Sequence, residues 1–285
     1  MRLDELIERC RRELASRGLP PDPDAEILMS ALAKVPRSRL RLESGSGAEA
    51  LLPRLAEWIE RRAAGEPVQY ILGAWEFYGR EFRLSRDTLI PRPETEGLVE
   101  RIVAEWRRAG REAGRMLDVG TGSGAIAVTL AAELPGVSLI AVDRLPGALA
   151  IARENARRHR VGDRIRFLCA DADSALKSGV RFDVVVSNPP YVSDSEWESL
   201  PREVRDFEPP EALRGGPDGL DLIRRLVRDG AGRLVPGGAL WLEIGAAQGG
   251  RVRSLPCAPL RFAGIERDLA GRDRVARWVL PEDRP

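Results

Sequence analysis

The sequence is poor in the residues that most often serve as catalytic bases and metal ligands. Its 285 residues include one histidine, His159, and three cysteines, Cys10, Cys169 and Cys257, which lie far apart in the chain. An odd number of distant cysteines indicates neither a disulfide framework nor a Cys-x-x-Cys metal site, so we expect buried, reduced thiols. His159 lies in an arginine-rich stretch, where a solvated side chain is expected rather than a catalytic base. The chemistry is therefore not expected to depend on histidine or on a metal.

Long hydrophobic runs and an excess of charge of one sign are also missing. Hydrophobic residues make up 43% of the chain, and no apolar run approaches the ~20 residues that a membrane-spanning helix needs. Residues 1–6 mix charges with leucines, unlike the apolar core of a secretory signal, so we expect a cytoplasmic protein without a membrane segment. A formal net charge of +1 gives no global field for a polyanion, which disfavours direct nucleic-acid binding.

The chain length favours two domains, because 285 residues exceed the usual size of one. Apolar residues at helical spacing predict helices at about 3–17, 24–34 and 48–64, which give a small N-terminal helical domain over residues 1–73. Two short strands around a turn at Gly79 and Arg80 predict a β-hairpin connector over residues 74–92. Residues 93–285 form the remaining, larger domain.

This larger domain shows the alternation of a doubly wound α/β fold. Strands are predicted at 116–119, 138–142, 165–169, 182–187 and 239–244, with helices from Pro93, from about 124, from about 147 and over 220–234. A final pair, at about 260–265 and 274–280, is expected to add an antiparallel edge. The predicted fold class is therefore α/β, with a seven-stranded Rossmann-like sheet.

A glycine-rich turn follows the first strand of this sheet. It consists of Gly120, Thr121, Gly122, Ser123 and Gly124. The glycines let the backbone approach a ligand closely, just where a helix begins. Nineteen residues after Gly124 the second strand ends in Asp143, where a carboxylate would accept hydrogen bonds from both hydroxyls of a ribose. These features predict a nucleotide cofactor, and they fit NAD and S-adenosylmethionine about equally well.

Four residues at the end of the fourth strand carry a second signal. Asn188, Pro189, Pro190 and Tyr191 follow a β-branched run, so they are expected at the carboxyl edge of the sheet, beside the glycine turn. The two prolines stiffen this loop, and Asn188 Oδ1 and the Pro189 carbonyl would form a pair of acceptors suited to a planar NH2 group. An ordinary turn after a strand is the competing interpretation.

The second signal favours S-adenosylmethionine over NAD. Hydride transfer needs a group that handles a proton, and this edge of the sheet offers neither a histidine nor a Tyr-x-x-x-Lys pair. A methyl donor at the glycine turn and an amide acceptor at Asn188 would instead lie about one strand spacing, ~5 Å, apart. The residues therefore predict methyl transfer to an NH2 group.

Together, the segment 118–124, Asp143 and the Asn-Pro-Pro-Tyr segment resemble class I, amino-group-directed methyltransferases that depend on S-adenosylmethionine. Further segments are similar to those of the bacterial peptide chain release factor N5-glutamine methyltransferases, the PrmC/HemK family. They lie at 67–73, 75–78, 89–96, 207–209, 216–220 and 242–245. The resemblance covers nearly the whole chain, and its most specific part is 89–96.

This resemblance implies methyl transfer from S-adenosylmethionine to the side-chain amide nitrogen (N5) of the glutamine in the Gly-Gly-Gln loop of class I release factors. It implies that residues 1–73 recognise this substrate, that the glycine turn and Asp143 bind the methionine and ribose parts of the cofactor, and that Asp171 and Ala172 lie beside its adenine. Some family members have a large apolar residue at position 172, so adenine affinity here is expected to come from neighbouring apolar residues.

The resemblance also implies that Asn188, Pro189, Pro190 and Tyr191 hold the substrate glutamine. Asn188, Pro189 and Tyr191 would take part in catalysis, and Asn188 would also contact the cofactor. Three alternatives stay open: a glutamine of a ribosomal protein as acceptor, an exocyclic amine of nucleic acid as acceptor, and a nucleotide-binding adaptor without catalytic activity.

Overall fold

The computed structural model describes residues 2–40 and 48–282. The chain forms two compact units. The first contains Met1–Ala74 together with Pro201–Phe207, and the second contains Trp75–Leu200 and Glu208–Pro285.

The first unit is helical. Its helices are α1 (Leu3–Ser16), α2 (Asp24–Ala33), α3 (Leu52–Ala63), α4 (Val68–Leu72) and α9 (Arg202–Arg205), with short 3-10 turns η1 (Arg37–Arg39) and η2 (Ala48–Leu51). Its apolar core is built from side chains spaced along α1, α2 and α3, as the periodicity predicts. The buried Arg62 side chain donates to Asp24 Oδ2 at 2.6 Å and also pairs with Glu203 at 3.0 Å. The ion pair between Arg62 and Glu203 ties the segment 201–207 to the helical core.

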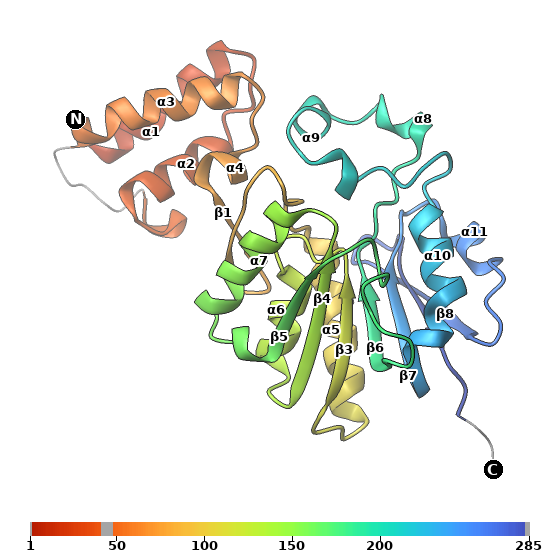
Figure 1. Ribbon diagram of the computed structural model, residues 1–285. Coiled ribbons are helices and arrows are strands. Elements are labelled where there is room, and N and C mark those ends of the chain that lie inside the picture. The colour runs from red at the N-terminus through yellow and green to blue at the C-terminus, as the bar shows by residue number, and fades with distance from the viewer. Residues whose placement is uncertain (1, 41–47, 283–285) are drawn as a thin grey trace. The chain divides into compact units, whose positions relative to one another are not determined.

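The second unit is built on a seven-stranded sheet (Figure 1) with the strand order β5-β4-β3-β6-β7-β9-β8. The strands are β3 (Gly114–Val119), β4 (Val137–Asp143), β5 (Ile165–Cys169), β6 (Phe182–Ser187), β7 (Leu234–Glu243), β8 (Arg261–Arg267) and β9 (Asp273–Val279). The first five strands in this order are parallel, and β9 runs antiparallel to both of its neighbours, β7 and β8. The predicted α/β class and the seven strands are confirmed.

Helices cover both faces of this sheet, because the buried strands are apolar on both sides. Side chains of α5 (Pro93–Arg108), α6 (Ala125–Glu133) and α7 (Pro146–Arg158) pack on one face, and those of α10 (Asp221–Asp229) and α11 (Gly249–Arg253) pack on the other. Smaller turns complete the unit: η3 (Gly162–Arg164), α8 (Asp194–Trp197), η4 (Pro210–Ala212) and η5 (Gly230–Arg233). The doubly wound arrangement leaves the carboxyl edge of the parallel strands for a ligand site.

The expectation of buried thiols is wrong for two of the three cysteines: Cys10 is buried, but Cys257 is only partly buried and Cys169 is exposed.

Two predicted turns are also misplaced. The hairpin strands are β1 (Ala74–Phe77) and β2 (Arg80–Arg83), so the turn is Tyr78-Gly79 rather than Gly79-Arg80. Both turn residues have positive φ, 53° for Tyr78 and 68° for Gly79, as a two-residue hairpin turn of type I′ requires. The predicted helix 220–234 ends at Asp229, and β7 begins at Leu234 rather than at 239, because residues 235–238 form an irregularity within the strand instead of a turn before it.

Candidate active site

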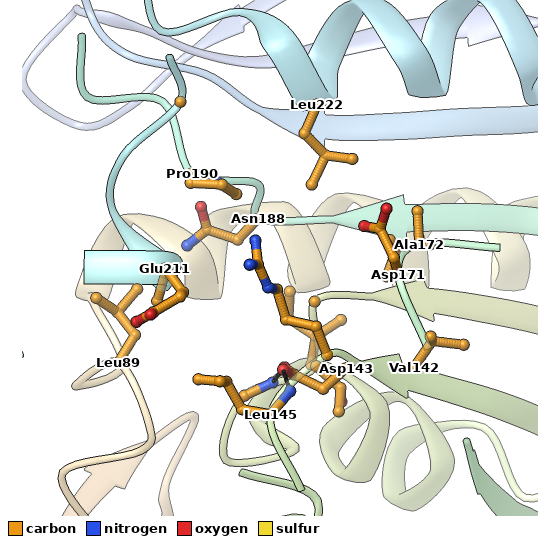
Figure 2. A pocket seen from close by; sticks show the side chains of 18 of the residues that line it. Leu89, Val142, Asp143, Leu145, Asp171, Ala172, Asn188, Pro190, Glu211 and Leu222 are labelled. Atoms are coloured by element: carbon orange, nitrogen blue, oxygen red, sulfur yellow. Dashed lines mark hydrogen bonds between the residues drawn. The ribbon is translucent and has the colours of Figure 1, made fainter. Parts of the chain in front are cut away.

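Three of the predicted site segments meet at one edge of the sheet. Strand β3 lies between β4 and β6, so the glycine turn that follows β3 lies between Asp143 at the end of β4 and Asn188 just after β6. A cavity of about 380 Å³ opens at this edge. Figure 2 shows Asn188 and Pro190 on one side of the cavity and Val142, Asp171 and Ala172 on the other. A volume of this size is within the range of pockets for small ligands.

The glycine turn is held by the carboxylate of Asp143. The Gly122 backbone N–H donates to Asp143 Oδ2 at 2.8 Å, and the Leu145 N–H donates to Oδ1 at 2.9 Å. Burial raises the pKa of Asp143, and these backbone donors oppose the rise by stabilising the charged form. Each carboxylate oxygen keeps a second lone pair, so Asp143 retains the acceptor capacity that two ribose hydroxyls need.

Two glycines of this turn are required by backbone conformation rather than by space. Gly120 has φ +73° and Gly122 has φ +56°, and an added Cβ would meet no atom within 4 Å at either position. A side chain would therefore fit, but the left-handed backbone would be strained. The turn thus brings its backbone to the cavity just before α6 begins, as the glycine pattern predicts. Its N–H groups are mostly engaged within the protein: those of Gly120 and Thr121 donate to the Val142 carbonyl, and that of Gly122 donates to Asp143.

Aliphatic side chains form part of the cavity wall. They are Val142, Leu145, Ala170, Ala172 and Leu222. The side chain of Ala172 is buried, and its φ of +49° is unusual for a residue with a Cβ. These aliphatic residues are the neighbours that the sequence-based prediction expects to replace a large side chain at position 172.

Asp171 has a partner that the sequence does not reveal. Arg225 of α10 donates to Asp171 Oδ2 at 2.7 Å and to the Asp171 carbonyl at 3.2 Å, and both residues line the cavity. The Asp171 side chain is 71% exposed, so this pair sits at the rim. It joins the loop after β5 to α10 at the edge of the cavity.

The carboxamide of Asn188 is held from one side only. Its Nδ2 donates to Thr95 Oγ1 at 3.1 Å, and Thr95 Oγ1 donates to Glu243 Oε2 at 2.7 Å. Among the residues that the structure describes, no group donates to Asn188 Oδ1. Because Asn188 lines the cavity, this oxygen is free to accept a hydrogen bond from a ligand there.

The other three residues of the loop differ in position. Pro190 lines the cavity, whereas Pro189 and Tyr191 are not among its lining residues. The Tyr191 ring packs against the apolar cluster shared with α10, and its hydroxyl lies 3.4 Å from Glu243 Oε1. Burial raises the pKa of Tyr191. The predicted packing of this ring on a substrate amide stays a prediction.

Two acids are fully buried next to the site. Asp118 at β3 accepts a hydrogen bond from Thr121 Oγ1 at 2.7 Å, and burial raises the pKa of Asp118 to about 7. Glu243 at the end of β7 is 0% exposed, and burial raises the pKa of Glu243 to about 7 as well. Both carboxyl groups are therefore able to change protonation near neutral pH.

Sequence reasoning gave no role to Thr95, Glu243 or Arg225. Thr95 and Glu243 fall in the segments 89–96 and 242–245, which were noted only for their family resemblance. They are 148 positions apart, and no local pattern predicts that α5 and β7 bring them together. Their place in those segments was the only available signal.

The comparisons with known proteins agree on one family. Residues 94–202 match a family model described as the methyltransferase small domain, and residues 5–73 match the PrmC N-terminal domain. A release factor glutamine methyltransferase of Cereibacter sphaeroides is 42% identical over 99% of this chain and 99% of its own length. One of Nitratidesulfovibrio vulgaris is 40% identical over 95% of this chain and 93% of its own length.

A solved structure supports the fold alone. A methyltransferase from Pyrococcus furiosus is 16% identical, covers 80% of this chain and 98% of its own, and has a TM-score of 0.50. In the described part of the chain, none of the helices is both long and apolar enough to cross a membrane. On the identity and coverage of its curated relatives, the chain belongs to the release factor glutamine methyltransferase family and is a methyltransferase that uses S-adenosylmethionine.

Proposed function

We propose that this protein methylates the side-chain amide nitrogen (N5) of the glutamine in the Gly-Gly-Gln loop of class I peptide chain release factors. The observation that carries the proposal is the geometry of Asn188, whose Nδ2 is engaged by Thr95 while Oδ1 is left to accept a hydrogen bond in the cavity. An acceptor at this place suits the NH2 group of a glutamine. Its relatives of about 40% identity are named release factor glutamine methyltransferases, which supports the same substrate.

The cavity residues fit S-adenosylmethionine. In this proposal the glycine turn lies against its charged methionine end, Asp143 accepts from the ribose hydroxyls, and the aliphatic residues around Ala172 contact the adenine. Asp171 lies at the adenine edge, with its carboxylate held by Arg225. When bound, the cofactor supplies an electrophilic methyl group attached to a sulfonium sulfur.

The acceptor loop makes the amide nitrogen a better nucleophile. The lone pair of an amide nitrogen is delocalised into the carbonyl, which weakens nucleophilic attack. In this proposal Asn188 Oδ1 accepts an N–H bond in the cavity, which favours a pyramidal nitrogen and stabilises the positive charge that develops on it. The Pro189 carbonyl is the predicted acceptor for the second N–H bond; because Pro189 is not among the lining residues, this part stays a prediction. Alignment of this kind contributes ~7 kcal/mol or more in favourable intramolecular systems. No strong base is needed, because the proton leaves after the methyl group has been transferred.

A ribosomal-protein glutamine and an exocyclic amine of nucleic acid present the same NH2 chemistry. The family names favour the release factor over the first, and the formal net charge of +1 disfavours the second. The proposed substrate acts in translation, which implies a cytoplasmic enzyme.

The test is a labelled methyl-donor assay with purified release factor, ribosomal protein and nucleic acid offered separately at equal concentration. We expect label on the release factor at a kcat/KM at least ~100-fold above the other two, because only the correct acceptor is aligned. Preferential labelling of the ribosomal protein or of nucleic acid would overturn the proposal. Absence of transfer to any of the three, with the cofactor bound, would favour a binding role without catalysis.

A further inference from the structure

A chain of two hydrogen bonds connects the proposed acceptor residue to a fully buried acid. Asn188 Nδ2 donates to Thr95 Oγ1 at 3.1 Å, and Thr95 Oγ1 donates to Glu243 Oε2 at 2.7 Å. The three residues come from the loop after β6, from the first turn of α5 and from the end of β7. Thr95 and Glu243 are both buried, so water does not compete for these bonds.

The charge of Glu243 sets the direction of this chain. An ionised carboxylate only accepts hydrogen bonds, so the single proton of the Thr95 hydroxyl must point to Glu243. The hydroxyl oxygen then has only lone pairs for Asn188, which must present its NH2 group. The carboxamide oxygen is left for the cavity as a consequence.

A protonated Glu243 would remove this constraint. Its hydroxyl would donate to Thr95 Oγ1, and the Thr95 proton would be free to point to Asn188. The carboxamide could then turn over and present its NH2 group to the cavity, where it would face the NH2 group of the substrate. Two donors that face one another repel, so this arrangement is unproductive.

We infer that Glu243 is a positioning residue for the acceptor: through Thr95 it holds the Asn188 carboxamide with its oxygen toward the substrate amide. The inference rests on the proposed function for the identity of that amide. Glu243 itself touches neither the substrate nor the reacting atoms. It fixes which end of the Asn188 carboxamide, the oxygen or the NH2 group, faces the cavity.

The surroundings of Glu243 bring its pKa close to neutral pH. Burial raises the pKa of Glu243 to about 7, and Glu94 of α5 contributes to the rise; Thr95, Arg274 of β9 and the Tyr191 hydroxyl act in the opposite direction. The proton is therefore bound below about pH 7 and lost above it. The productive orientation of Asn188 is expected to be enforced above this value and to be lost as the pH falls through it.

The first arm of the test reads Asn188 directly. Asn155 and Asn188 are the only two asparagines in the sequence, so selective ¹⁵N-asparagine labelling of the full chain gives just two side-chain NH2 signals. Asn155 donates to two backbone carbonyls, of Arg83 at 3.0 Å and of Ser123 at 2.8 Å, and serves as the internal control. We expect the Asn188 signals to titrate with a midpoint near pH 7 while the Asn155 signals do not.

Substitution assigns this titration to Glu243, because the pKa of Asp118 is also raised to about 7. In Glu243→Gln the titration of Asn188 should disappear, since the substituted carboxamide does not ionise. In Thr95→Val the Asn188 signals should move to the position of an unbonded NH2 group. An unchanged titration in Glu243→Gln, or Asn188 signals that stay constant across neutral pH in the wild type, would overturn the inference.

The second arm measures methyl transfer. We expect Glu243→Gln and Thr95→Val to lower kcat by about tenfold or more with little change in the affinity for S-adenosylmethionine, because the lost bonds only orient the acceptor. Thr95→Ser should restore most of the rate that Thr95→Val loses, since it restores the hydroxyl. The wild-type kcat should also fall as the pH drops below about 7, and Glu243→Gln should lack this step.

A matched control is available in α6. Thr129 is fully buried like Thr95, and within the described residues its hydroxyl has no hydrogen-bond partner. Thr129→Val makes the same chemical change away from the cavity and should leave kcat at the wild-type value. A similar loss of rate in Thr129→Val, or a loss in Glu243→Gln without any change of the Asn188 signals, would mean that these substitutions act through general packing and would contradict the positioning role.

Failure of the inference is separable from failure of the proposed function. The NMR signals are recorded on the free enzyme and need no substrate, so they decide the hydrogen-bond chain even if the release factor is not methylated. A titrating Asn188 with unchanged kcat in Glu243→Gln would overturn the positioning role alone.

Discussion

Asn155 and Asn188 show how differently the same side chain is used in one molecule. The carboxamide of Asn155 is fully engaged: its Oδ1 accepts from the Arg83 N–H at 2.8 Å, and its Nδ2 donates to two carbonyls. It ties α7 to the end of the hairpin and to the glycine turn. Asn188 is engaged only through Nδ2, so half of its hydrogen-bonding capacity is kept for a ligand.

Replacing Asn188 should therefore affect turnover rather than cofactor binding. We predict that Asn188→Ala lowers kcat by ~10²-fold or more and leaves the affinity for S-adenosylmethionine within about tenfold, because the carboxamide mainly aligns the acceptor. Steady-state kinetics together with calorimetric cofactor titration measures both quantities. Asn155→Ala is the contrasting variant, expected to lower the free energy of unfolding by ~1–3 kcal/mol through its unsatisfied buried partners. Near wild-type turnover by Asn188→Ala would contradict the proposed role.

Asp143 should show the opposite division of effects. We predict that Asp143→Ala weakens S-adenosylmethionine binding by ~1.5–3 kcal/mol, through the loss of a charge-assisted hydrogen bond, with a smaller fall in the saturated rate. Asp143→Asn keeps one acceptor oxygen and should lose less. Isothermal titration calorimetry checks both variants, and unchanged affinity in Asp143→Ala would remove this residue from the ribose site.

The glycine turn is the element in which backbone conformation matters most. We predict that Gly122→Ala costs ~1–2 kcal/mol of unfolding free energy, because its φ of +56° is strained for a residue with a Cβ, and that it also weakens cofactor binding. Gly179 is a matched control, since its φ is +82° and an added Cβ there meets no atom within 4 Å. Gly179→Ala should show a similar loss in denaturant melts with unchanged cofactor affinity. Equal effects of both variants on affinity would contradict a cofactor role for the turn.

Signals that lie within one element were enough to predict most of the elements. The β-branched run of β6 and the glycines after β3 are local patterns, and the structure confirms the strands they predict. The predicted hairpin turn is one residue too late in the chain. Tyr78 takes a positive φ, which is uncommon for a residue with a large side chain and which the sequence therefore does not indicate. Likewise, Pro236 and the two glycines after it are typical of a turn. In the structure they lie within β7, because β7 pairs with β6 on both sides of them, at Leu234 and at Ala239.

Sequence patterns did not predict the contacts between elements that are distant in the chain. Thr95 with Glu243 and Asp171 with Arg225 each join segments that only the sheet topology brings together. The residues predicted for the cofactor and acceptor therefore came from local motifs, whereas the groups that orient them came from the tertiary structure.

At the scale of the whole molecule, the helical unit is where we expect substrate selection. A separate amphipathic core and the match to the PrmC N-terminal domain motivate this prediction for residues 1–73. The segment 201–207 belongs to the same unit through the Arg62 and Glu203 ion pair. A variant that lacks residues 1–73 keeps the cavity residues but loses the partners of this segment, so its folding must be checked by circular dichroism first.

If the truncated enzyme folds, we predict that it still binds S-adenosylmethionine but methylates intact release factor poorly. A Gly-Gly-Gln peptide reaches little beyond the cavity, whereas a folded protein substrate buries ~1,000 Å² or more. The ratio of kcat/KM for protein to that for peptide should therefore fall. Equal fractional losses for the two substrates would indicate that residues 1–73 are a structural cap.

The central claim is the position of the transferred methyl group, and tandem mass spectrometry of release factor treated with the enzyme and S-adenosylmethionine tests it most directly. The account predicts a gain of one methyl group on the side-chain nitrogen of the Gly-Gly-Gln glutamine, and no gain in a release factor in which this glutamine is replaced. A methyl group on any other residue, or one that persists after the replacement, would contradict it.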